Sequence, residues 1–167
     1  AGSFGAVRLG NITPESYFAT ADYVSMHNHD TGPSSDALYG GPFLSKNKVM
    51  YMTPSMGGFS ASYAMTAGEK VEKNGTDVAM NYDAGPFHGG FGYSKQGDAN
   101  QWALRALYEM GPVVLGGYYQ KNDLGAAKQD IWRFAAMYAF GASELHFNYG
   151  AADKAGTVAS KGDQWTF

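Results

Sequence analysis

One segment of the chain occurs twice, with the second copy 26 residues after the first. The run from Tyr82 to Pro86 leads on to Tyr93-Ser94-Lys95, and the run from Tyr108 to Pro112 leads on to Tyr119-Gln120-Lys121. Each copy predicts a strand, a tight Gly-Pro turn, a second strand and a polar loop. An up-and-down sheet with short turns at one end and longer loops at the other has this repeat. The matched tyrosines favour the transmembrane barrel version of such a sheet.

Most of the predicted strands alternate apolar and polar residues with a period of two. In the segment 102–109, Trp102 and Tyr108 fall on one face, while Arg105 and Glu109 fall on the other. The sequence therefore predicts an all-β fold built from one antiparallel up-and-down sheet. The ten predicted strands are about 2–10, 47–54, 58–66, 77–83, 87–95, 102–109, 113–120, 131–139, 143–149 and 163–167.

Aromatic residues stand at both ends of the apolar face. The residues beside the short turns are Tyr82, Tyr108 and Tyr138. The residues beside the long loops are Trp102, Trp132 and Trp165. The distance from Trp102 to Tyr108 is roughly 20 Å along a strand that rises about 3.3 Å per residue. This length approaches the apolar band of an outer-membrane barrel, which is about 25 Å tall with an aromatic girdle at each edge.

The alternative is a soluble all-β module that binds a ligand or a sugar and keeps the same aromatics in its core. Such a sandwich concentrates its aromatics in the middle of the strands and needs many Lys and Glu side chains on its water-facing side. The second face of these strands carries Gly, Ala, Ser and Asn with few charges. The sequence therefore favours the barrel over the sandwich.

The composition narrows the possible functions. Among the 167 residues 16% are charged and 15% are aromatic, and no run of 18 apolar residues indicates a transmembrane helix. A net charge of −3 without a basic face gives no indication of nucleic-acid binding. Cysteine is absent, which excludes thiol nucleophiles, disulfides and cysteine metal sites. No Ser-His-Asp order or Gly-rich phosphate loop occurs, so the sequence predicts neither an enzyme nor a cofactor site.

One short motif resembles a metal site. The run His27-Asn28-His29-Asp30 places three potential ligands together, but no further ligands follow at a typical spacing. Ordinary hydrogen bonding within a loop is therefore favoured over metal binding.

The cationic residues divide into two groups. Arg8, Arg105 and Arg133 lie in predicted strands, on the face opposite the aromatics, and Lys48 lies at a strand start. The other lysines fall in loops or at strand ends. Arginine stays charged when desolvated and presents a fixed fork of donors, which suits the wall of a confined lumen. The structural alternative is that each arginine neutralises a nearby acid such as Glu109 or Glu144.

The longest irregular stretch, about residues 11–46, shows no clear secondary structure. Loops of this length are usually functional or disordered, and the aromatic residues in this one indicate that it packs against something. A loop that folds into a barrel lumen places its acids opposite wall arginines and creates a transverse field at a constriction. The acids in question are Glu15, Asp22, Asp30 and Asp36.

Several motifs in a fixed order resemble one family. The run from Ser3 to Gly10, then a long loop, then Asn47 to Pro54 and Gly57-Gly58-Phe59 is similar to the general porins of Gram-negative outer membranes. The similarity is strongest to the beta-proteobacterial and neisserial type, and Gly162 to Phe167 resembles the start of a later strand in that type. It extends over essentially the whole chain.

The resemblance implies a transmembrane barrel of about 16 strands in the bacterial outer membrane, assembled as a homotrimer in lipid and lipopolysaccharide. It implies passive diffusion of ions and small hydrophilic solutes, with a mild preference for anions. We expect residues 1–167 to form part of a single barrel domain, with the constriction loop at about 11–46, because both ends fall inside predicted strands. The residues expected to line the pore are Arg8, Arg105, Arg133, Lys48, Glu15, Asp22, Asp30 and Asp36.

Overall fold

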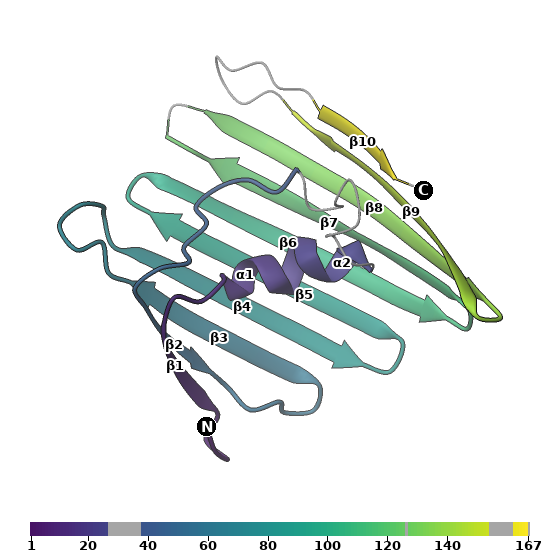
Figure 1. The fold of residues 1–167 in the computed structure, drawn as a ribbon, viewed down its shortest axis with the longest axis horizontal. Coiled ribbons are helices and arrows are strands. Elements are labelled where there is room, and N and C mark those ends of the chain that lie inside the picture. The colour runs from purple at the N-terminus through teal and green to yellow at the C-terminus, as the bar shows by residue number, and fades with distance from the viewer. Residues whose placement is uncertain (27–37, 126, 154–161, 167) are drawn as a thin grey trace.

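Ten strands form one antiparallel sheet in which each strand pairs with its neighbours in the sequence (Figure 1). The computed structural model describes residues 1–26, 38–125, 127–153 and 162–166. The strands are β1 (Ala6–Gly10), β2 (Lys48–Met52), β3 (Phe59–Thr66), β4 (Gly75–Ala84), β5 (Phe87–Gln96), β6 (Ala99–Met110), β7 (Val113–Asp123), β8 (Lys128–Phe140), β9 (Ser143–Ala152) and β10 (Gly162–Thr166). This order confirms the predicted all-β up-and-down fold.

Several strands extend further toward the long loops than predicted. β6 begins at Ala99 and β7 continues to Asp123, because the ladder between them runs on to the pair Asn100 and Asp123. β1 is shorter than predicted and begins at Ala6, since Gly2 and Gly5 close a turn on each other before it. Gly5 has a φ of 106°, and an added Cβ would lie 2.1 Å from the Met52 carbonyl oxygen, so only glycine fits.

The repeated Gly-Pro motif forms two-residue hairpin turns. Ala84 pairs with Phe87 across Gly85-Pro86, and Met110 pairs with Val113 across Gly111-Pro112. Both glycines have φ near +60°, the left-handed conformation that suits the first central position of a hairpin turn. The predicted turn chemistry therefore fixes the register of both hairpins.

The two faces of the sheet have the reverse of the polarity found in a soluble protein. Large apolar side chains point outward and remain exposed, as Leu104 does with 52% of its surface accessible. Polar and charged side chains point inward and are buried. Examples of the second group are Lys48, Asp77, Ser94, Gln101, Gln120 and Asn148. An apolar outer face around a polar interior is the arrangement of a membrane barrel with an aqueous lumen.

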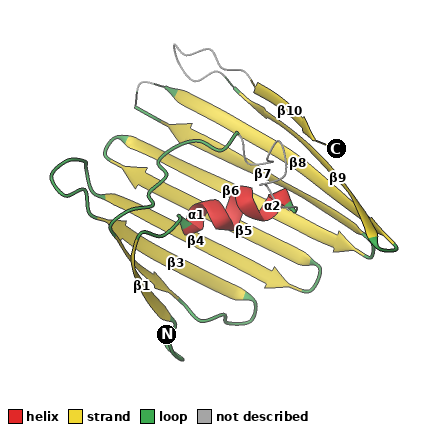
Figure 2. Ribbon diagram, in the orientation of Figure 1, coloured by secondary structure: helices red, strands yellow, loops and turns green. Residues whose placement is uncertain are grey.

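The segment between β1 and β2 departs from the prediction, because it contains a helix. The helix runs through α1 (Glu15–Tyr17), a π-helical turn η1 (Phe18–Asp22) and α2 (Tyr23–Ser25), and it lies on the concave face of the sheet (Figure 2). Tyr17, Ala21 and Val24 recur at helical spacing and supply its apolar side. Eleven residues were too few for this pattern to stand out in the sequence. None of the described helices is long and apolar enough to cross a membrane.

Candidate functional site

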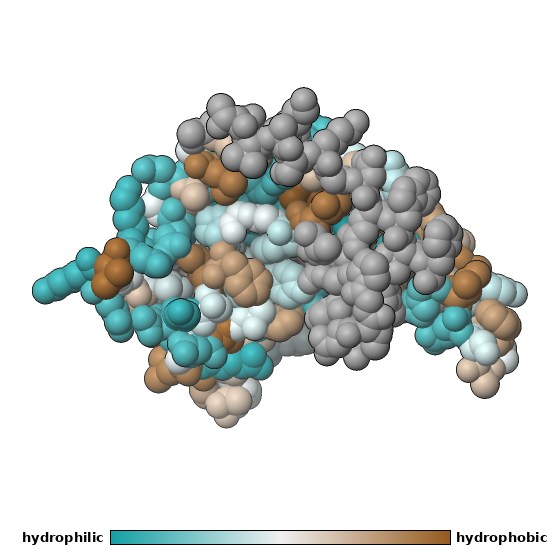
Figure 3. Space-filling model, turned by 45° about the horizontal axis from the view of Figure 1, so that its top comes forward, coloured by the Kyte–Doolittle hydropathy of each residue, from teal (hydrophilic) through white to brown (hydrophobic). Residues whose placement is uncertain are grey.

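The helix of the long loop lies across the middle strands of the sheet. α1 contacts β4 and β5, η1 contacts β4, β5 and β6, and α2 reaches β7. In the space-filling view, this side of the molecule shows hydrophilic and near-neutral residues with scattered hydrophobic ones among them (Figure 3). The loop helix therefore lies on the inner side of the curved sheet, where the buried polar side chains are.

Two glycines of β5 allow the helix to approach the wall closely. A Cβ added to Gly90 would lie 2.2 Å from the Ala19 carbonyl oxygen, and one added to Gly92 would lie 2.5 Å from the Ser16 carbonyl oxygen. Both neighbours are backbone atoms of the helix, so no side chain can give way. β5 thus offers a bare strip of backbone on which the helix rests.

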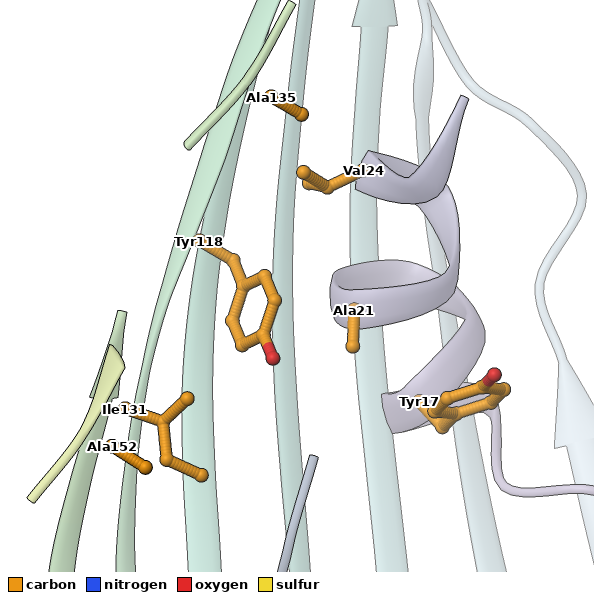
Figure 4. Close-up of a cluster of buried hydrophobic side chains, with 7 residues drawn as sticks. All are labelled: Tyr17, Ala21, Val24, Tyr118, Ile131, Ala135 and Ala152. Atoms are coloured by element: carbon orange, nitrogen blue, oxygen red, sulfur yellow. The ribbon is translucent and has the colours of Figure 1, made fainter. Parts of the chain in front are cut away.

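An apolar contact holds the far side of the helix. Tyr17, Ala21 and Val24 belong to a buried cluster, in which Val24 and Ala21 lie on the side of the helix that faces Tyr118 of β7 (Figure 4). The wall residues of this cluster are Tyr118, Ile131, Ala135 and Ala152. Burial of apolar surface at this cluster stabilises the loop against the wall.

The start of the helix is fixed by a carboxylate of the wall. Pro14 precedes the helix and provides no side-chain cap. Asp77 of β4 takes over this role, because its Oδ1 accepts hydrogen bonds from the backbone amides of Glu15 at 2.9 Å and Ser16 at 3.4 Å. A negative charge at a helix N-terminus satisfies the free amide groups and interacts favourably with the helix dipole.

The same carboxylate organises a small buried network. Its Oδ2 accepts hydrogen bonds from the hydroxyls of Ser16 and, at 2.8 Å, of Ser94. The ammonium nitrogen of Lys48 lies 3.8 Å from Oδ1, with both side chains almost fully buried. A buried charge is tolerated when its partners neutralise it and satisfy its hydrogen bonds. Removal of one partner therefore destabilises the protein, because the remaining charge is left buried and uncompensated.

Glutamine side chains of the wall hold the returning arm of the loop. Gln101 donates to the Tyr39 hydroxyl at 3.0 Å, and Gln120 donates to the Gly40 carbonyl oxygen. A backbone hydrogen bond from Ile12 to the Ser45 carbonyl oxygen closes the base of the loop at 2.9 Å. Both arms are therefore attached to the wall at several points.

The predicted wall arginines all lie on the inner face. Across β4 to β9, one row of opposing residues contains Asn81, Gly90, Arg105, Tyr118, Arg133 and Gly150. Arg105 and Arg133 are 4% and 2% exposed and lie in this row on either side of Tyr118, whereas the Arg8 side chain is 54% exposed.

Arg105 contacts the loop through an aromatic ring. Its guanidinium carbon lies 3.5 Å from the centroid of the Tyr23 ring, a cation–π geometry. Its Nη2 donates to Asn81 at 3.2 Å and to the Gly89 carbonyl oxygen. Within the described part of the chain, these hydrogen bonds go to neutral groups rather than to the carboxylates expected from the sequence.

The predicted acids are placed as follows. Glu15 lies at the helix start, where its carboxylate is 3.5 Å from Arg8, and Asp22 lies half-buried at the end of the π-helical turn. Burial raises the pKa of Glu15 above its ordinary value of 4.5, and Arg8 opposes this shift only in part. Asp30 and Asp36 lie outside the described residues, as does the run His27 to Asp30.

The sequence reasoning missed the residues that attach the loop. Asp77, Ser94, Gln101 and Gln120 are all polar residues in the inward phase of their strands. Their inward position in the alternation could have identified them, because a polar side chain on a wall covered by a loop needs a hydrogen-bond partner.

We predict that Asp77→Asn loosens the start of the loop helix. A charge-assisted hydrogen bond contributes about 1.5–3 kcal/mol, so the Glu15 and Ser16 amides should exchange their hydrogens roughly 10- to 100-fold faster. Hydrogen exchange measured by mass spectrometry checks this. Asp98→Asn is the matched control, because Asp98 is an exposed carboxylate that pairs with Lys73 and is far in sequence from the loop. Equal exchange in both variants would contradict the anchoring role.

The comparisons with known proteins agree on one family. The sequence model described as Gram-negative porin matches residues 1–167. Outer membrane porin protein 32 of Delftia acidovorans is 26% identical over 197 residues, a match that covers 99% of this chain and 55% of that protein. The chain thus spans about half the length of this curated relative.

Solved structures share the fold. The anion-selective porin from Comamonas acidovorans matches with a TM-score of 0.78 at 24% identity, over 99% of this chain and 58% of that one. A porin structure refined at 1.8 Å matches with a TM-score of 0.67 at 18% identity, over 95% of this chain and 64% of that one. With its outward apolar face, its polar interior and a family match along its whole length, the chain belongs to the Gram-negative porins of the bacterial outer membrane.

Proposed function

We propose that the protein is a channel through which ions and small hydrophilic solutes diffuse passively across the outer membrane, and not an enzyme. The observation that carries this proposal is the loop helix, which Asp77 and the glycine strip of β5 hold on the polar inner face of the sheet. A loop in that position narrows a water-filled lumen without closing it, so passage depends on the size and charge of the solute.

Charges at the narrowing set the ion preference. We infer that Arg8, Lys48, Arg105 and Arg133 on the wall face the acids of the loop and produce a mild anion preference. The loop acids in this arrangement are Glu15, Asp22, Asp30 and Asp36. The similar porin from Comamonas acidovorans is named anion-selective, but a likeness at 24% identity supports the fold alone. The preference therefore rests on the cationic side chains of this chain.

The proposed assembly is a homotrimer surrounded by outer-membrane lipid and lipopolysaccharide, with residues 1–167 as part of a single barrel domain. The exposed apolar and aromatic outer face supports contact with lipid. A soluble all-β binding module, the alternative from the sequence, would need to cover this face in water.

Single-channel recording of the full-length natural protein in a planar bilayer tests the proposal. Under a KCl gradient, we expect conductance steps that appear in groups of three, together with a reversal potential on the anion side. An absence of conductance steps from folded, detergent-purified protein would contradict the channel proposal. A control with the same detergent and no protein excludes leakage of the bilayer.

Arg105→Ser combined with Arg133→Ser should move the reversal potential toward cations. A perfectly selective channel under a tenfold gradient of a monovalent salt has a reversal potential of roughly 59 mV. Loss of two positive wall charges should change the reversal potential by a measurable fraction of this value. The matched control is Lys121→Ser with Lys128→Ser, which removes the same charge from exposed side chains paired with Asp130 and Asp123. An unchanged potential in the arginine variant removes both residues from the selectivity mechanism.

Acidification should strengthen the anion preference in two stages. Because the pKa of Glu15 is raised, this carboxylate takes up its proton at a pH above the ordinary 4.5 as the pH falls. Protonation removes a negative charge beside Arg8, so the reversal potential should shift toward anions before the exposed acids titrate. In Glu15→Gln the first stage should be absent at every pH. If the first stage persists in this variant, a group other than Glu15 causes it.

A further inference from the structure

The two arms of the long loop enclose a cavity that is lined mainly by aromatic side chains. Its volume is about 650 Å³, within the range of roughly 300–1,000 Å³ that is usual for small-molecule sites. The aromatic residues are Tyr17, Phe18, Tyr39 and Phe43, and Thr13 and the Gly40-Gly41 backbone complete the lining. All of these residues belong to the loop, so the cavity is a feature of the loop and not of the wall.

Two of the rings are accessible from outside the cavity. Phe18 and Phe43 are 40% and 49% exposed. Ser16 and Ala19, which flank Phe18, are buried against the glycines of β5. Because successive helical residues are rotated by roughly 100°, Phe18 points away from the strand that its neighbours contact. A solute on the side of the loop opposite β5 can therefore reach these rings.

The rings hold one another in a defined arrangement. The Tyr17 ring centroid lies 5.1 Å from that of Tyr39 and 5.5 Å from that of Phe43, both in edge-to-face geometry. Asp77 fixes the arm that carries Tyr17, and Gln101 donates to the Tyr39 hydroxyl on the returning arm. The cavity is thus formed before a solute arrives, which lowers the entropic cost of binding.

The lining selects the chemistry of the solute. None of the described lining residues has a charged or amide side chain, and their only polar side-chain groups are hydroxyls. The Tyr39 hydroxyl already accepts from Gln101, and burial raises the pKa of Tyr39, so this group stays neutral. A sugar or an inorganic ion would lose hydrogen bonds to water that this lining does not replace. An aromatic ring loses few and gains stacked or edge-to-face contacts with Phe18 and Phe43.

We propose that the constriction loop carries a binding site for small aromatic solutes in the cavity between Phe18 and Phe43, an inference that rests on the proposed channel function. A solute that crosses the lumen passes the loop, and an aromatic ring is retained there by the exposed rings. Aromatic solutes therefore reside longer at the loop than aliphatic solutes of the same charge.

Single-channel recording of the full-length protein in symmetrical KCl with added benzoate tests the site. Benzoate should interrupt the open-channel current with a dependence on concentration that saturates. Cyclohexanecarboxylate has the same charge on a ring of similar size that is not aromatic, so it should interrupt the current less. In Phe18→Ala and in Phe43→Ala, the apparent Kd for benzoate should rise roughly two- to tenfold, because each variant removes one aromatic contact.

Phe134→Ala is the control variant, because Phe134 is 43% exposed on the outer face of β8, away from the loop. It should keep the natural Kd. Channels that respond equally to the two carboxylates, or a Kd for benzoate that is unchanged in both loop variants, would overturn the proposed site. If Phe43→Ala does not assemble, Phe43→Leu replaces it, since leucine keeps an apolar side chain without the ring.

An absence of channels in the natural protein would overturn the proposed function and not the site. Saturation-transfer NMR of benzoate with the folded full-length protein in detergent then decides, because it detects binding without conduction. A signal that is weaker in Phe43→Ala than in Phe134→Ala supports the site. Equal signals in these two variants exclude it.

Discussion

The hydrogen bonds from the loop helix to Asp77 are the interaction on which the inner arrangement depends. The helix has no cap of its own, so a short helix in water would fray from its first turn. The wall carboxylate supplies the missing acceptor, and the Ser16 and Ser94 hydroxyls with Lys48 make its burial tolerable. Once the first turn is fixed, the direction of the helix is set, and Tyr23 arrives over Arg105 at the opposite end.

The second constraint is the reversed polarity of the sheet. In a soluble protein the aromatic face would be the core, and the fold would close over it. In this sheet the aromatic face stays outside, and the loop fills part of the polar side, where glutamines, serines and charges provide the contacts. The loop is therefore held mainly by directional hydrogen bonds, with one apolar cluster around Tyr118 and Ile131 as the exception. Directional contacts specify a position more narrowly than apolar burial does.

Much of the fold was predictable because membrane strands obey a simple rule. The period of two assigned Arg105 and Arg133 to the face opposite Trp102 and Trp132, and burial agrees, because both arginines are buried while Trp132 is exposed. The Gly-Pro repeat fixed two turns, because glycine φ near +60° is a local property. Strand ends were less accurate, since Asn100 and Asp123 continue the ladder with residues that are ordinarily found in loops.

The candidate site was harder to predict because its contacts link distant parts of the chain. The helix of residues 15–25 has only four buried apolar positions, in a segment too short for a helical pattern to stand out. The cap comes from a residue 61 positions after Ser16, which no local pattern reveals. Gly90 and Gly92 make room for another segment of backbone, a role that the sequence around them does not indicate. The roles of the predicted pore residues stay predictions.

The topology also determines an order of assembly. Each strand pairs only with its neighbours in the sequence, so the sheet grows by one hairpin after another with short loop closures. The loop contacts instead span 61 to 80 residues, from Ser16 to Asp77 and from Gly40 to Gln120. The surface that receives the loop does not exist until β4 to β7 have formed. The segment near the start of the chain must therefore wait, and the loop on the inner face is completed after the strands that hold it.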